Sequence, residues 1–299
     1  MTQRLILPIM LLLAAVTGCA SKNGNTTDRS DTLSGLELPV PDIPDSITHP
    51  ERRAAYAALR WWDALDFAND SRSLDTAFIE QNFVNFMTVL ANTDTLSRQR
   101  AVDRLLSSAQ HYPQAWSLMT EVAEKYLYDP NSPFRSDELY IPFLRSQSRS
   151  PLADEARRHR DAYRLSMALK NRPGHPATDF SFVTRDGLRT SLHAVKGDKP
   201  LLLIFYNPDC ESCGETIARL RKVDLTGRFT VLAVDAESER DRWEATAAAM
   251  PADWTVGYAL TPVLEEEIYD LKASPTIYVL DTDKRVICKD VAPELLTDD

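Results

Sequence analysis

A long stretch without glycine constrains the fold of this chain more than any other feature. None of the nine glycines among its 299 residues lies between Gly35 and Gly174. Apolar residues recur at intervals of three and four through this stretch, and such a pattern without glycine is typical of α-helices. The helical period predicts an all-α domain of about six helices with short connections.

Proline and aromatic residues support this prediction. Pro50 suits the first turn of the first helix, expected over PERRAAYAALRWWDALDFAN, because proline lacks an N–H that would have no partner there. We expect four aromatic residues to pack in the core that the helices share, rather than to bind a ligand: Phe78, Phe83, Phe86 and Trp116.

The composition changes at residues 171–180, NRPGHPATDF, where proline and glycine end the last helix. Strands then alternate with helices. The expected strands are DFSFVT and LRTSLHAV, joined by an Asp-Gly turn, then LLLIFY, FTVLAVDA, WTVGYAL, TIYVLD and RVICKD, and the expected helices are residues 211–223, RDRWEATAAAM and PVLEEEIYDLK. This alternation predicts a mixed central sheet flanked by helices, and the fold class is α + α/β.

The N-terminal segment is typical of a signal peptide. Residues 1–18 contain the basic Arg4 and an apolar run of about a dozen residues, shorter than the about 20 that a spanning helix needs. The residues VTGC resemble a bacterial lipobox, which implies that Cys19 carries lipid and attaches an exported protein to the membrane. Ala20 stands where an aspartate would favour the inner membrane, so we expect the outer membrane. An ordinary secretory signal with a coincidental cysteine is the alternative.

A tether follows the signal. Residues 19–48 are polar and turn-rich and then rich in proline, which indicates an extended spacer, with a packed arm over residues 36–47 as the alternative. The predicted parts of the chain are residues 1–18 as the signal peptide, 19–48 as the lipidated cysteine and tether, 49–172 as the helical domain and 173–299 as the α/β domain.

The net charge of −10 argues against a nucleic-acid partner, because phosphates need clustered lysine and arginine.

The number and spacing of the four cysteines limit the disulfides that the chain can form. If Cys19 carries lipid, three remain, and an even set of disulfides is excluded. Cys288 is expected to be a buried free thiol, with a third redox thiol as the alternative. Cys210 and Cys213 form a Cys-x-x-Cys pair shortly after LLLIFY.

Three interpretations of this pair compete. A zinc site needs four ligands, and no second close pair of cysteine or histidine exists, so no metal is expected. A structural disulfide would close a very short loop and stabilise little. A redox pair explains the placement, because a helix N-terminus at the carboxyl end of a strand stabilises a thiolate at Cys210. Cys213, one turn later, could then resolve a mixed disulfide.

The segment KASPTIYVL supplies a second signal. With it, residues 173–297 resemble the thioredoxin fold, and more closely the membrane-tethered thiol–disulfide oxidoreductases of the TlpA/ResA type. That family carries a cis-proline facing the Cys-x-x-Cys helix; an ordinary trans-proline is the alternative. The resemblance implies a thioredoxin-like C-terminal domain, with Cys210 and Cys213 as catalytic residues and Ser274, Pro275 and Asp209 as substrate-binding residues. The helical part resembles an uncharacterised domain that precedes such domains in some Gram-negative lipoproteins.

The chain departs from that family around the cysteines. Asp209 replaces an aromatic residue, Glu211-Ser212 replaces a dipeptide that ends in proline, and Thr216 stands where a carboxylate is usual, with Glu215 displaced by one. Asp209 and Glu211 flank Cys210, and their negative charge disfavours a thiolate, so we expect a potential nearer to that of thioredoxin, about −270 mV, than to the about −120 mV of strongly oxidising proteins. Glu211 and Glu215 are expected to modulate the site. Acids that point to solvent and alter little are the alternative.

The function that these signals favour is a tethered thiol–disulfide oxidoreductase that reduces disulfides of exported proteins. It needs no cofactor and takes electrons from an unidentified donor. The alternative is a lipoprotein adaptor whose helical domain binds a partner, with the thioredoxin-like part as a scaffold of little catalysis. Peroxide reduction would need a threonine three residues before the reactive cysteine, and Asn207 stands there.

Overall fold

A computed structural model describes residues 37–237 and 239–297, and Leu38–Asp299 form one compact unit. The predicted signal peptide, the lipid on Cys19 and the first part of the predicted tether lie outside the described residues and stay predictions. Within the described ranges, no helix is both long and apolar enough to cross a bilayer.

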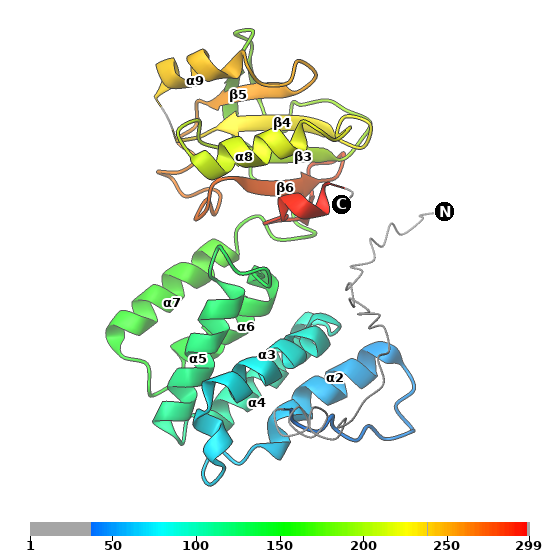
Figure 1. The fold of residues 1–299 in the computed structure, drawn as a ribbon, viewed down its shortest axis with the longest axis vertical. Helices are drawn as coiled ribbons and strands as arrows, with labels where there is room; N and C mark the ends of the chain where they lie inside the picture. The colour runs from blue at the N-terminus through cyan, green and yellow to red at the C-terminus, as the bar shows by residue number, and fades with distance from the viewer. Residues whose placement is uncertain (1–36, 238, 298–299) are drawn as a thin grey trace, which may run out of the picture. The chain divides into compact units, whose positions relative to one another are not determined.

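Helices fill the region that lacks glycine (Figure 1). They are α2 (Pro50–Arg60), η1 (Trp61–Ala64), η2 (Ser71–Leu74), α3 (Thr76–Ala91), α4 (Thr95–Ala109), α5 (Pro113–Leu127), α6 (Asp137–Ser148) and α7 (Glu155–Ala168), where η marks a 3-10 helix. Proline in the first turn opens α2 and α5, and an aspartate side chain accepts backbone N–H groups at the start of α3, α4 and α7.

The first helix is shorter than expected. It ends at Arg60 and continues as the 3-10 turn η1, so that Trp61 and Trp62 are both buried. Sequence periodicity could not show this change of helix type, because the pattern suits a continuous helix.

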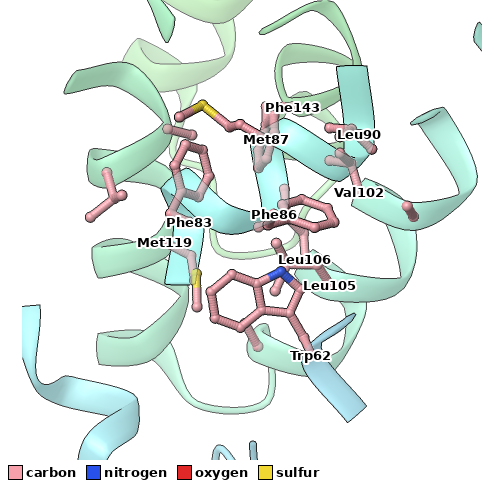
Figure 2. Close-up of a cluster of buried hydrophobic side chains, with 14 of the residues drawn as sticks. Trp62, Phe83, Phe86, Met87, Leu90, Val102, Leu105, Leu106, Met119 and Phe143 are labelled. Atoms are coloured by element: carbon pink, nitrogen blue, oxygen red, sulfur yellow. The ribbon is translucent and has the colours of Figure 1, made fainter. Parts of the chain in front are cut away.

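Aromatic side chains fill the helical core, as expected (Figure 2). The four aromatic residues singled out in the sequence are all buried. Phe83 lies with its ring centroid 5.6 Å from that of Phe143, and Trp62 meets Phe86 edge to face at 5.9 Å. Such pairs add to the free energy gained from burial.

The C-terminal part of the unit holds a seven-stranded mixed sheet in the order β2-β1-β5-β4-β3-β6-β7. Its elements are β1 (Ser181–Thr184), β2 (Arg189–Ser191), β3 (Leu201–Tyr206), α8 (Glu211–Leu220), β4 (Thr230–Asp235), α9 (Arg240–Ala247), β5 (Thr255–Ala259), β6 (Thr276–Leu280), β7 (Val286–Cys288) and the 3-10 helix η3 (Pro293–Leu295). Strand β3 is buried along its whole length and pairs parallel to β4 and antiparallel to β6. The prediction of a helical region followed by a thioredoxin-like mixed sheet is confirmed.

The two faces of the sheet are covered differently. Helices α8 and α9 pack on one face, with Ile217, Leu220 and Trp243 in a common apolar cluster (Figure 1). The other face is covered by an irregular segment, residues 261–271, whose Val263 and Tyr269 are buried against it.

A helix was predicted over almost the whole of that segment, PVLEEEIYDLK (262–272), and the prediction is wrong. One turn forms, with the N–H of Glu266 donating to the carbonyl of Pro262, and Glu267 then adopts a φ of 51°. The hydroxyl of Tyr163 donates to Glu267 at 2.7 Å, and the amide of Asn171 donates to the carbonyl of Ile268 at 2.8 Å. These contacts distant in sequence override the local helical pattern.

A cluster of buried charges lies between the start of α6 and the C-terminal strands. Its members are Arg135, Asp137, Asp270, Lys272, Lys289 and Asp290. Asp137 is the centre, with Lys289 at 2.5 Å and Lys272 at 3.2 Å. The three positive and three negative charges compensate one another, which is the condition for burying them.

Candidate active site

Cys210 lies where β3 gives way to α8. The strand ends at Tyr206, a short turn follows, and Cys210 is the N-cap residue of α8. Its own N–H donates to the carbonyl of Asn207 at 3.1 Å, which fixes the turn, and its Sγ accepts the N–H of Cys213 at 3.4 Å. The sulfur therefore faces the unpaired N–H groups and the partial positive charge of a helix start.

The loop before β6 approaches this sulfur. The peptide bond between Ser274 and Pro275 is cis, as the resemblance implied. The carbonyl oxygen of Ser274 lies 3.6 Å from Cys210 Sγ. The hydroxyl of Ser212 lies 3.0 Å from the same sulfur and 3.0 Å from the same carbonyl, and its single proton goes to the carbonyl or, when Cys210 is a thiolate, to the sulfur. Ser212 thus joins the nucleophile to the cis-proline loop.

The two sulfurs sit in different environments. Partial burial raises the pKa of Cys210, but hydrogen bonds from Ser212 and Cys213 outweigh it, and the pKa lies below its ordinary value. Cys213 is 1% exposed, and burial is the main cause that raises its pKa to about 12. The structure therefore separates a partly exposed thiol of lowered pKa from a buried thiol of raised pKa.

The acidic residues around the pair behave differently from the sequence expectation. Asp209 forms an ion pair with Arg242, which neutralises its charge. Glu211 and Glu215 are exposed on α8. The net shift in the pKa of Cys210 is downward, opposite to the effect expected from flanking acids. Hydrogen bonds to the sulfur dominate over these solvated charges.

Cys288 also differs from expectation. It was predicted as a buried free thiol, but it lies exposed on the edge strand β7. Strand β7 is the outermost strand of the sheet and shifts register against β6 between Val279 and Leu280, and its last two residues, Ile287 and Cys288, are exposed. The sulfur of Cys288 is nevertheless partly desolvated, which raises its pKa. Among the described residues, no group of three or more His, Cys, Asp or Glu side chains is placed to hold a metal ion.

Sequence reasoning missed three residues of this site: Ser212, Glu237 and Arg242. Ser212 could have been found from its place in the first turn of α8, beside the N-cap sulfur. Glu237 could have been found because it follows β4, the parallel neighbour of β3, and such strands end at the same edge of a sheet. Arg242 carries no comparable signal, since its contact with Asp209 depends on the position of α9.

Comparison with known proteins agrees with this geometry. Residues 17–171 match a family described as a domain of unknown function, DUF5106. The chain is similar to a thioredoxin-like protein from Bacteroides caccae, with 32% identity, a TM-score of 0.76 and coverage of 87% of this chain and 96% of that one. No curated protein matches it.

Two further solved structures are similar over the C-terminal part. One is a conserved protein of unknown function from Bacteroides fragilis, with 33% identity, a TM-score of 0.39 and coverage of 42% of this chain and 96% of that one. The other is the thioredoxin domain of a thiol-disulfide oxidoreductase from Bacteroides vulgatus, with 18% identity, a TM-score of 0.36 and coverage of 42% and 92%.

Proposed function

The chain belongs to the DUF5106 family and has a thioredoxin-like fold, and from this premise we propose that it is a thiol–disulfide oxidoreductase that reduces disulfides of exported proteins through Cys210 and Cys213. One observation carries the proposal. The accessible sulfur of Cys210 lies at a helix start and 3.6 Å from the carbonyl of Ser274, while Cys213 stays buried one turn behind it.

The proposed reaction has two exchange steps. The thiolate of Cys210 attacks one sulfur of a substrate disulfide, and the other substrate sulfur leaves with the electron pair and takes up a proton. Cys213 then loses its proton and attacks Cys210 Sγ, which releases the second substrate sulfur as a thiolate. The substrate gains two electrons and two protons, and the cysteine pair becomes a disulfide. The upstream donor must return two electrons as a dithiol or an equivalent reductant.

The cis-proline loop would orient the substrate. The backbone of Ser274 borders the nucleophile, so an extended peptide could pair with it beside the sulfur. Reduction is the direction we propose, because the buried Cys213 gains no stabilisation as a thiolate, which limits how far the reduced form is favoured, although the lowered pKa of Cys210 acts in the opposite direction. A redox titration against glutathione tests the direction, and a midpoint above about −180 mV contradicts it.

The lipid anchor belongs to the same proposal. VTGC would carry lipid on Cys19 and hold the enzyme at the outer membrane, with residues 20–36 as a tether. The alternative of a packed arm applies to the residues that follow, because Leu38 is buried in the helical core and its N–H donates to Asn82 at 2.7 Å. Cellular labelling with a fatty acid tests this, since Cys19→Ala should lose the label and leave the membrane fraction. Retention of both by Cys19→Ala would contradict the anchor and leave the redox proposal intact.

An insulin-reduction assay tests the activity itself. The full chain should reduce insulin with dithiothreitol as the donor, and Cys210→Ser should fall to the rate without protein. Equal slow rates for both proteins would instead support the adaptor, in which the thioredoxin-like part is a scaffold. The Cys213→Ala variant should hold substrates as mixed disulfides in cells, and their identification would name the substrate proteins.

A further inference from the structure

The buried Cys213 needs a group that accepts its proton, and neither cysteine of the pair can be that group. Cys213 must lose a proton before it can attack Cys210, yet burial holds it as a thiol. The position three residues after it, where related proteins carry a carboxylate, is the buried Thr216. Glu215 is exposed on α8. A base would have to come from another element.

Glu237 comes from the adjacent strand. Strands β3 and β4 are parallel, with Tyr206 in register with Asp235, so the residues that follow them leave the sheet at one edge. Oε2 of Glu237 accepts a hydrogen bond from the side-chain amide of Asn207 at 3.0 Å. Oε1 accepts one from the hydroxyl of Ser274 at 2.8 Å. The carboxylate therefore spans the gap between the cysteine turn and the cis-proline loop.

Both partners of Glu237 are part of the site. Asn207 accepts the N–H of Cys210 with its carbonyl, at 3.1 Å, and the carbonyl of Ser274 lies against Ser212 and Cys210. The negative charge of Glu237 also acts on Cys213: after burial, it is among the causes that raise the pKa of that thiol. Glu237 is thus an exposed carboxylate that is held by two residues bordering Cys210 and whose charge acts on Cys213.

We propose that Glu237 accepts the proton of Cys213 when the mixed disulfide on Cys210 is resolved. The inference rests on the proposed oxidoreductase function. The proton of Cys213 passes to the Glu237 carboxylate, directly or through one water molecule, and the freed electron pair forms the bond from Cys213 Sγ to Cys210 Sγ. The bond from Cys210 to the substrate breaks, the substrate sulfur leaves with its electron pair, and Glu237 then returns the proton to that thiolate or to solvent. Glu237 is neither oxidised nor reduced.

The two exchange steps can be timed separately with one equivalent of the disulfide 5,5′-dithiobis(2-nitrobenzoate). Attack by Cys210 releases a first coloured thiolate, and attack by Cys213 releases the second. The experiment uses the full chain with Cys19→Ser and Cys288→Ser, so that only the two thiols of the pair react. Glu237→Gln is the test variant, because glutamine keeps the shape and can keep hydrogen bonds to Ser274. Glu215→Gln is the matched control on the exposed side of α8.

The proposal predicts that Glu237→Gln slows the second exchange step selectively. Glu237→Gln should slow the second phase about 10- to 100-fold at neutral pH, at or below the low end of general-base contributions because solvent can partly substitute. The first phase should change less than about twofold, and the deficit should shrink as pH rises and hydroxide replaces the base. A charge that acted only electrostatically would give the opposite result, since its removal eases ionisation of Cys213 and speeds the second phase.

Three outcomes overturn the proposal: a second phase that is unchanged or faster, both phases slowed in parallel, or the same deficit in Glu215→Gln. Failure of the oxidoreductase proposal looks different. It would appear in the parent protein as release of a single thiolate, the behaviour expected of Cys213→Ser.

Discussion

The hydroxyl of Ser212 should set the acidity of the nucleophile, and Ser212→Ala tests this directly. The substitution removes the oxygen 3.0 Å from Cys210 Sγ and leaves the backbone of α8 in place, where the N–H of Cys213 also donates to the sulfur. Alanine is the best helix former, so α8 should be retained.

The magnitude follows from the contact. A hydrogen bond to a charged group contributes about 1.5–3 kcal/mol, and the exposed position of Ser212 places it at the low end, because water takes over part of the role. About 1.4 kcal/mol corresponds to one pKa unit, so the pKa of Cys210 should rise by about one unit. At a pH above the pKa of Cys210 in both proteins, the reduced form is destabilised by the same amount, and the midpoint potential should fall there by about 30 mV.

The assay is a pH titration of the ultraviolet absorbance of the thiolate in protein that carries Cys19→Ser and Cys288→Ser, with Cys210→Ser as the blank. Because the pKa of Cys210 is lowered in the parent protein, its thiolate forms at lower pH than an ordinary cysteine, and the Ser212→Ala curve should shift to higher pH. Ser212→Thr should restore the parent curve. Identical curves for the parent and the alanine variant would refute the reasoning.

Three further outcomes are expected elsewhere in the chain. Asp137→Ala should lower the free energy of unfolding in urea by about 3–5 kcal/mol, since it removes the carboxylate that pairs with the buried side chain of Lys289 and one of the two that pair with Lys272, whereas a loss below 1 kcal/mol would contradict that role. Gly257→Ala should cost about 1–3 kcal/mol, because a Cβ would meet the buried ring of Phe182 at 2.5 Å; Gly214→Ala, in open space on α8, should be neutral or stabilising and serves as the control. Iodoacetamide at neutral pH should modify Cys210 before the edge-strand cysteine, whose pKa is raised by burial of its sulfur, and mass spectrometry of the peptides would reveal the reverse order.

Much of the fold follows from local patterns in the sequence. The glycine-free stretch, the aspartate caps and the first-turn prolines define the helices, because each acts within one turn. The fully apolar run Leu201–Tyr206 and the helix after it place the cysteine pair correctly for the same reason. The cis bond at Pro275 came from the resemblance, and no residue pattern alone would have indicated it.

The misses depend on contacts between distant segments. Residues 261–271 read as a helix, but Tyr163 and Asn171 bind its turn in another conformation. The acids next to Cys210 suggested a disfavoured thiolate. Their charge can be read from the sequence, but the hydrogen bond between the Ser212 hydroxyl and the sulfur cannot. The ion pair of Asp209 with Arg242 and the reach of Ser212 both require the arrangement of side chains in space.

The near-complete burial of Cys213 has a consequence for the oxidative damage that the cysteine pair can suffer. A sulfur that is 1% exposed is closed to peroxides, to glutathione and to a second client protein, so irreversible oxidation to the sulfinic state should fall on its neighbour alone. Because Cys213 is protected in this way, a reduced thiol remains beside any substrate that is attached to Cys210. The mixed disulfide can therefore be resolved within the protein, without a second thiol compound.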